Sequence, residues 1–307
     1  MKMKVSYLLR FFAVVGIVFA ISVFGFAQQQ DGRGRGGDGR GRGGAGAEGR
    51  GGGDARGGGD ARGGGGGQAR GPQTPPPPFK PTASDTLKTK DGDLKITPVN
   101  HAGVMFQLGN SVLYADPVGN YSELPKADYI LITDIHGDHM DPNAVKTLSK
   151  AGTVVIAPPE VVKTVTEARP LANGANETIK LNGKNVKIEA IPMYNMTRGP
   201  AAGQFYHTKG RGDGFILDIG GKRVYLAGDT ECTPEMKALK NIDVAFLPMN
   251  LPFTMTPQEA ADCAKAFKPK VVYPYHYRDN DPSTEPQQFA DALKDTKGVE
   301  VRMRNWY

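Results

Sequence analysis

The sequence predicts an α/β fold in which two mixed β-sheets pack together and helices cover the outside. From about residue 92 onward, short apolar segments rich in β-forming residues alternate with short amphipathic segments. Gly109-Asn110 and Gly220-Gly221 each lie between two such apolar segments and mark two-residue hairpin turns. Hairpins place strands antiparallel, whereas strands joined through a helix run parallel, so we expect both kinds of pair.

The individual elements follow from these patterns in chain order. Strands are expected where apolar and β-branched runs end at turn signals, at 94–99, 103–108, 111–115, 128–133, 153–157, 186–191, 214–219, 222–227, 242–247, 270–275 and 299–303. Helices are expected where apolar residues recur every three or four positions, at 141–149, 159–167, 233–240, 256–267 and 285–294.

The first 27 residues have the composition of a secretory signal peptide. Three basic residues precede an apolar run from Phe11 to Phe24, and Gly25 and Ala27 put small side chains at the two positions that a signal peptidase reads. The run is shorter than the roughly 20 residues of a membrane-spanning helix. We therefore expect an exported protein, periplasmic or secreted. An uncleaved membrane anchor is the alternative, if residues 5–9 join the apolar run.

Residues 28–81 predict a disordered linker. Residues 31–71 are nearly all Gly with Arg and Asp, and four prolines follow at 75–78. Such a segment has no apolar groups to bury and stays disordered, and the proline run is stiffer. The tract lacks the aromatic residues that stack on bases, so we expect no nucleic-acid partner. An anionic envelope surface is the expected partner for its arginines.

Residues 133–141, which read Thr-Asp-Ile-His-Gly-Asp-His-Met-Asp, form the most informative motif. They follow an expected strand and precede an expected helix, with Asp141 as N-cap and Pro142 at the first helical position. A loop between strand and helix can turn several side chains toward one point. The ligand-type side chains are Asp134, His136, Asp138 and His139.

Imidazole and carboxylate together suit a divalent ion such as zinc, with manganese or iron as alternatives. Four ligand-type residues within six exceed what one tetrahedral ion takes from a single loop. Two adjacent metal ions are therefore expected, as in hydrolytic two-metal sites. The other interpretation is a polar loop whose Asp and His side chains only cap the next helix.

These residues resemble a known family. The motif is similar to the His-x-His-x-Asp-His signature of the metallo-β-lactamase superfamily, with Asp134 where the first His usually stands. Residues 100–103 and 113–117 resemble the start of the branch that includes ascorbate-6-phosphate lactonase and related predicted hydrolases. Residues 225–230 and 271–277 resemble the strands that supply the bridging carboxylate and the last metal His.

The resemblance covers about residues 92–307 and implies a four-layer αβ/βα sandwich with metals at one edge of the sheets. Residues 82–307 would then be the hydrolase domain. It implies that Asp229 bridges the two ions and that His276 is a ligand; a helix N-cap is the other role open to Asp229.

One ligand position is ambiguous in the sequence. Family members place a metal His on the loop after a strand like 188–192, whereas this loop reads Met193-Tyr194-Asn195-Met196. Either Asn195 is a weak oxygen ligand, or His207 arrives from further along the same loop. We favour His207, because imidazole binds these ions better than an amide.

Other residues are expected to support the ligands or the substrate. His101 would donate a hydrogen bond to a ligand carboxylate, or else serve only the local turn. Asp116 would orient a ligand His. Hydrogen bonds to a developing oxyanion would come from one of Tyr194, Asn195, Tyr206, Tyr275 and Tyr277. Cys232 and Cys263 are expected as two separate buried thiols, with one disulfide as the alternative; Cys232 could lie near the metals.

These features predict a metal-dependent hydrolase acting on a small-molecule lactone, ester or phosphodiester. A metal-activated hydroxide would attack, and Asp138 would hold it and accept its proton. Fold alone does not choose the substrate, and the sequence leaves the oligomeric state open. The alternative is an envelope-tethered metal-binding or interaction protein whose site is degenerate, because Asp134 replaces a His and no His follows residue 192.

Overall fold

The computed structural model describes residues 76–81, 83–278 and 281–307, all within one compact unit. The predicted signal peptide and residues 28–75 of the predicted linker lie outside the described residues. Pro76 and Phe79 already contact the folded part: Asn120 donates to the Pro76 carbonyl, and the Phe79 amide donates to the Asn120 carbonyl over 2.9 Å.

The first sheet holds seven strands, counted over the described residues, in the order in which they occur in the sequence. Its first four strands pair antiparallel and the later ones pair parallel, starting with the β4–β5 pair. The strands are β1 (Asp85–Thr89), β2 (Gly92–Pro98), β3 (Val104–Leu108), β4 (Ser111–Ala115), β5 (Tyr129–Leu131), β6 (Val154–Ala157) and β7 (Arg169–Pro170).

The second sheet repeats this plan. Strands β8 to β11 pair antiparallel, and parallel pairing begins at β11–β12. The strands are β8 (Asn176–Leu181), β9 (Lys184–Met193), β10 (Gly212–Ile219), β11 (Lys222–Leu226), β12 (Val244–Met249), β13 (Val271–Tyr277) and β14 (Glu300–Val301). Both predicted hairpin turns are confirmed, since Leu108 pairs with Ser111 and Ile219 with Lys222.

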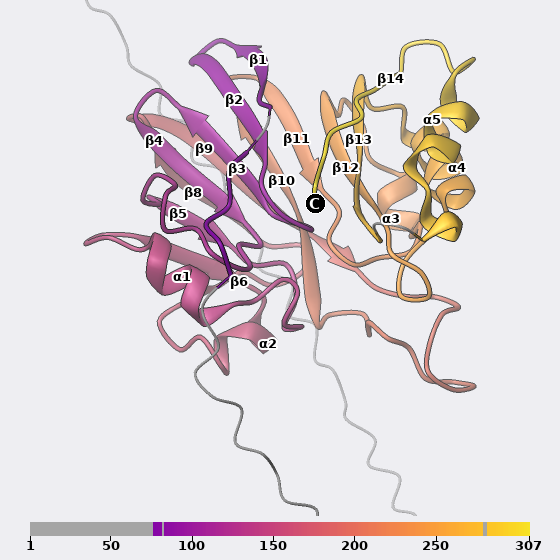
Figure 1. The fold of residues 1–307 in the computed structure, drawn as a ribbon, viewed down its shortest axis with the longest axis horizontal. Helices are drawn as coiled ribbons and strands as arrows, with labels where there is room; N and C mark the ends of the chain where they lie inside the picture. Colours follow the sequence, from indigo (N-terminus) through magenta and orange to yellow (C-terminus); the bar gives the residue numbers. More distant parts are fainter. Residues whose placement is uncertain (1–75, 82, 279–280) are drawn as a thin grey trace, which may run out of the picture. The chain divides into compact units, whose positions relative to one another are not determined.

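Helices lie on the outer sides of the sheet pair, α1 and α2 beside the first sheet and α3 to α5 beside the second (Figure 1). Each of the five begins with proline, whose fixed φ suits the first helical turn. They are α1 (Pro142–Leu148), α2 (Pro159–Val162), α3 (Pro234–Lys237), α4 (Pro257–Phe267) and α5 (Pro286–Leu293), with a 3₁₀ turn at Pro282–Thr284. Asp141 caps α1 as predicted, accepting from the Asn143 amide.

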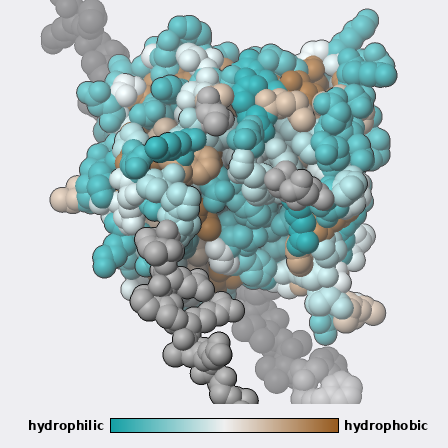
Figure 2. Space-filling model, viewed as in Figure 1, coloured by the Kyte–Doolittle hydropathy of each residue, from teal (hydrophilic) through white to brown (hydrophobic). Residues whose placement is uncertain are grey.

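Two apolar clusters complete the layers. The larger one joins inward-facing side chains of both sheets, such as Phe106 and Phe215, to those beneath the second set of helices, such as Phe289. The smaller one joins the first sheet to α1 and α2. The predicted four-layer αβ/βα sandwich is therefore confirmed. The face shown in Figure 2 is mainly hydrophilic, and no helix within the described ranges is long and apolar enough to cross a membrane.

Three strands escaped the sequence prediction, and all three lie at sheet edges. β1, β7 and β8 carry mostly exposed or half-exposed side chains, so they lack the apolar runs of central strands. The helix expected at 159–167 ends at Val162. Thr164, Val165 and Thr166 follow within four residues, and β-branched residues weaken helix propagation.

The two cysteines form a disulfide, so the expectation of two separate thiols was wrong. Cys232 follows β11 and Cys263 lies in α4, with their Cα atoms 5.7 Å apart. The sequence could not decide this, because the two residues stand 31 positions apart. The bond ties the segment that carries Asp229 to a helix of the outer layer.

Asp213 gives the fold a testable pH dependence. Its carboxyl is fully buried beside Asn173, and burial raises its pKa to about 7. An unfolded Asp titrates near 3.9. Between roughly pH 4 and 7 the folded chain therefore binds one more proton than the unfolded chain, and the free energy of unfolding falls as pH rises.

We expect Asp213→Asn to remove this loss. The difference in the free energy of unfolding, variant minus unmutated protein, should increase by up to about 4 kcal/mol from pH 4 to pH 8. Urea denaturation at both pH values measures it. The matched control is Asp218→Asn, a partly exposed carboxylate on the same strand. If Asp213→Asn and the unmutated protein differed in the free energy of unfolding by the same amount at both pH values, Asp213 would not titrate as its burial demands.

Candidate metal centre

The predicted ligands come together at the carboxyl ends of the parallel strands. The loop after β5 carries the 134–139 motif, Asp229 follows β11, and His276 lies near the end of β13. His207 comes from the long loop between β9 and β10. The chain has five histidines, and all five lie at this place: His101, His136, His139, His207 and His276.

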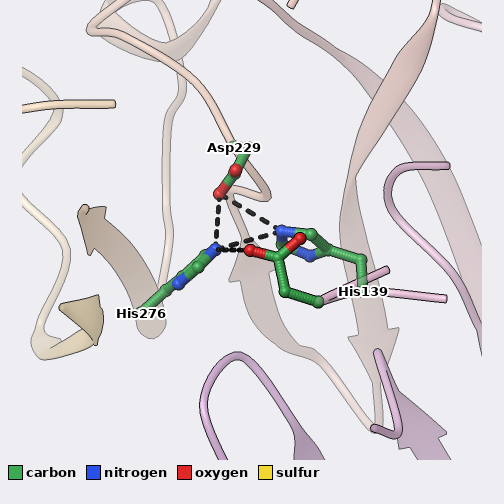
Figure 3. A group of neighbouring side chains, drawn as sticks. His139, Asp229 and His276 are labelled. Atoms are coloured by element: carbon green, nitrogen blue, oxygen red, sulfur yellow. Dashed lines mark hydrogen bonds and ion pairs between the residues drawn. The ribbon is translucent and has the colours of Figure 1, made fainter. Parts of the chain in front are cut away.

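The first group of potential ligands is compact. Its imidazole and carboxylate atoms lie within 4.8 Å of one another and belong to Asp138, His139, Asp229 and His276. His276 Nε2 lies 3.0 Å from both His139 Nε2 and Asp229 Oδ1, and 3.7 Å from Asp138 Oδ2. Figure 3 shows the three labelled side chains directed at a common point.

The second group consists of Asp134, His136 and His207. Asp134 Oδ2 lies 2.8 Å from His136 Nδ1 and 3.8 Å from His207 Nε2. Asp229 stands between the two groups, because its Oδ1 faces the first and its Oδ2 lies 3.3 Å from His207 Nε2. One carboxylate thus presents an oxygen to each group. Thr233, and not Asp229, caps α3.

Asp116 contacts His139 of the motif. Its Oδ2 accepts a 2.8 Å hydrogen bond from His139 Nδ1, and its two oxygens also accept from the amide and hydroxyl of Thr133. With the proton on Nδ1, the Nε2 lone pair of His139 points into the first group.

His207 reaches the site, and Asn195 holds it in place. The Asn195 side-chain oxygen accepts from both the backbone amide and the Nδ1 of His207, over 2.7 and 2.8 Å. The Asn195 amide group donates to Glu231 and to the Phe253 carbonyl. Because its oxygen is engaged with His207, Asn195 supports a ligand-type residue and is not part of either group. His207 thus lies beside Asp134 and His136, while Asn195 lies behind it.

His101 contacts a carboxylate of the first group, that of Asp138. Its Nε2 lies 3.4 Å from Asp138 Oδ2, and its Nδ1 lies 2.9 Å from the hydroxyl of Tyr307. The His101 amide donates to the Trp306 carbonyl. The last residues of the sequence therefore pack behind Asp138, a contact that no sequence pattern indicated.

Three residues of the site have left-handed backbone conformations. His101, Asp116 and His276 have φ values of 56°, 44° and 48°. L-residues other than Gly adopt this region at a cost, and such residues gather where function fixes a side chain. In His276 the turn of the backbone inside β13 coincides with a register shift of the neighbouring β12.

The electrostatics of the first group favour a cation among its ligands. Burial would raise the pKa of Asp229, but His276 and His139 hold it well below its usual range. Burial would lower the pKa of His139, but Asp229 and Asp116 hold it well above. Burial lowers the pKa of His276, which keeps its imidazole neutral. The carboxylates of this group therefore favour a positive charge at its centre, which a proton on His139 supplies and which a metal ion bound through His139 Nε2 would replace.

The donor geometry fits a divalent ion. Asp229 Oδ1 and His207 Nε2 are buried without a hydrogen-bond partner among the described residues. Two imidazole nitrogens, His139 Nε2 and His276 Nε2, face each other at 3.0 Å. Ligands of a tetrahedral zinc with bonds near 2.05 Å are about 3.3 Å apart. The first group therefore has the ligand types and spacing of such a site, and its members would hold the ion.

A cleft of about 340 Å³ opens on both groups. Its wall carries two aromatic rings that contact each other, Tyr206 and Phe253, with centroids 4.8 Å apart. The other lining residues are His136, Asp138, His207 and Asp229. Tyr194, predicted to donate to the substrate, is absent from the lining, and its hydroxyl donates to Glu235 instead. Cys232, which could have lain near the metals, lines a separate cavity beside its disulfide.

Arg211 and Glu231 are among the residues that sequence reasoning missed. Arg211 donates two hydrogen bonds to Asp134, from Nε and from a terminal nitrogen, over 3.2 and 3.0 Å. Glu231 accepts from the amides of Met196, Thr197 and Arg198 and so anchors the loop that carries Asn195. The only sequence feature that could have indicated Glu231 is its position two residues after Asp229. No sequence feature indicated Arg211, because it follows Asp134 by 77 positions.

Comparison with known proteins gives this geometry a context. The model of the beta-lactamase superfamily domain matches residues 98–277. A UPF0173 metal-dependent hydrolase of Thermus thermophilus is 30% identical over 220 residues, 67% of this chain and 94% of that protein. A crystal structure from Parabacteroides distasonis, described provisionally as a metal-dependent hydrolase, is 45% identical with a TM-score of 0.65, covering 72% and 98% of the two chains. Igni18, a metallo hydrolase of Ignicoccus hospitalis, shares the fold at 24% identity and a TM-score of 0.56, covering 69% and 95%.

The role of Asp116 can be tested through the proton on His139. In Asp116→Asn, the side-chain NH₂ group would face His139 Nδ1, and Nδ1 would accept its hydrogen bond. The imidazole proton would then lie on Nε2, where it would block metal binding in the first group. We expect zinc affinity to fall about 10–100-fold, measured by competition with a chromophoric chelator. The control is Asp262→Asn on the surface of α4. Unchanged affinity in Asp116→Asn would mean that His139 is not a ligand through Nε2.

Proposed function

Since the chain belongs to the beta-lactamase superfamily and is a metal-dependent hydrolase, we propose that it uses two divalent ions to hydrolyse a lactone, ester or phosphodiester. The observation that carries the proposal is the placement of Asp229, with one carboxylate oxygen toward each group of ligands. A shared carboxylate of this kind lets two ions lie close together.

The ions would be held by the two groups already described, with Asp229 between them. Once bound, zinc, or alternatively manganese or iron, supplies a water ionised near neutral pH and a Lewis acid for the carbonyl or phosphoryl oxygen. Asp138 is the residue that holds the attacking water and accepts its proton. Its side chain is 42% exposed toward the cleft, whereas that of Asp229 is only 3% exposed.

The cleft supports a small-molecule substrate. Tyr206 and Phe253 offer apolar ring faces for its carbon skeleton, while the ligand side chains surround the reacting bond. A volume of about 340 Å³ is at the small end of ligand pockets. The loop from residue 194 to 211 supplies Tyr206 and His207, so its conformation sets which substrate is accepted.

Export is the proposed location of the protein. The basic and apolar pattern of residues 1–27 supports it, and so does the Cys232–Cys263 disulfide, because disulfides persist mainly in oxidising compartments. The linker at 28–81 would then hold the 82–307 hydrolase domain away from the envelope. Its arginines would contact anionic surfaces.

Metal content and turnover test the function together. We expect the purified protein to bind two ions per chain when zinc or manganese is supplied in excess, and to hydrolyse bis-p-nitrophenyl phosphate or a simple lactone. Dialysis against a chelator should abolish this turnover, and added zinc or manganese should restore it. Which of the two substrates is turned over ranks the substrate class.

Variants make the test specific to the site. His276→Ala should lower turnover more than about 100-fold, because losing a ligand costs more than the 10–100-fold of losing its hydrogen-bond partner. Tyr129→Phe, on β5 and outside the cleft, should keep full activity. Less than one ion per chain, unchanged by added metal, would contradict the proposal and leave the fold as a binding module.

A further inference from the structure

A fixed positive charge lies inside the second group of ligands. Two nitrogens of the Arg211 guanidinium donate to the two carboxylate oxygens of Asp134, and one of them lies 3.5 Å from His136 Nδ1. The remaining nitrogen donates to the Tyr206 carbonyl over 2.8 Å. Asp134 is fully buried, while the Arg211 side chain is 21% exposed. All three nitrogens of the guanidinium are thus engaged.

The backbone leaves Arg211 little freedom to move away. The next residue, Gly212, passes so close to the motif that a Cβ there would lie 2.9 Å from the Thr133 carbonyl and 3.3 Å from Asp134 Oδ1. The Asp213 amide donates to the same Thr133 carbonyl. The start of β10 is therefore fixed against the 133–141 motif. Arg211 is the last residue of the loop before this strand, so its backbone is held at the site.

The first group has no such cation. No lysine or arginine in the described part of the chain forms an ion pair with Asp138 or Asp229; the side chains that pair with these carboxylates are histidines. The first group therefore offers two carboxylates to an ion. The second offers one carboxylate already neutralised by Arg211, two imidazoles and a shared oxygen of Asp229.

We propose that Arg211 makes the two metal sites unequal. An ion in the first group meets net negative charge, whereas an ion in the second must displace or tolerate a guanidinium at hydrogen-bonding distance from its carboxylate ligand. The first ion therefore binds tightly and the second weakly. This inference rests on the proposed function, because it assumes that both groups bind metal. It explains why Asp can stand at the position of the superfamily's first His: the carboxylate anchors Arg211.

The test is a zinc titration of the metal-free full chain, monitored by calorimetry and by native mass spectrometry. We expect two binding steps whose dissociation constants differ at least tenfold. In Arg211→Gln and Arg211→Met the second step should tighten at least tenfold, while the first stays within threefold. Either variant suffices if the other does not fold. Arg211→Lys keeps the charge and should keep the second step weak.

Arg223→Gln is the matched control, because Arg223 pairs with Glu189 on the second sheet, away from both groups. It should leave both steps unchanged. Equal affinities in the unmutated protein, or an unchanged second step once the charge at 211 is removed, would overturn the inference and leave the proposed function standing. Failure of the first step in the unmutated protein would instead refute the proposed function.

Discussion

The arrangement of the site depends on one buried carboxylate, that of Asp229. Its position is set by the residue before it: Gly228 has a φ of +65°, and a Cβ there would lie 2.4 Å from the Met193 sulfur and 3.2 Å from Thr133. The Gly228 amide donates to the hydroxyl of Tyr275 in β13. The end of β11 is thus packed among the ends of β5, β9 and β13. Only this close approach lets one carboxylate present an oxygen to ligands from both sheets.

Two of the imidazoles are held in place by a hydrogen bond from their Nδ1 to a second residue. Asp116 from β4 orients His139, and Asn195 orients His207. Asn195 depends in turn on Glu231, which gathers the amides of residues 196–198. The disulfide joins the residue after Glu231 to α4. Burial of these polar groups is tolerated because nearly every one of them has a partner, which also fixes the direction of each ligand atom.

The two sheets share a plan of four antiparallel strands followed by parallel ones, and the site lies where the carboxyl ends of the parallel strands meet. Loops at this position can vary without disturbing the apolar layers beneath, so family membership alone does not fix the substrate. The pair of Asp134 and Arg211 shows how a departure from the family signature can be matched by a second residue far away in the chain.

The sequence by itself determined the layers, the hairpin turns, the start of α1 and most of the candidate ligands, because these follow from local patterns: apolar periodicity, glycine turns, a capping Asp with Pro, and a dense cluster of Asp and His. It could not find the edge strands β1, β7 and β8, whose side chains face solvent. Tertiary structure alone decided that Asn195 supports His207, that Tyr194 turns away toward Glu235, that Cys232 bonds Cys263, and that Arg211 reaches Asp134. Each of these joins residues distant in sequence, and such pairings are fixed by how the sheets pack and by the burial that demands a partner for every polar group.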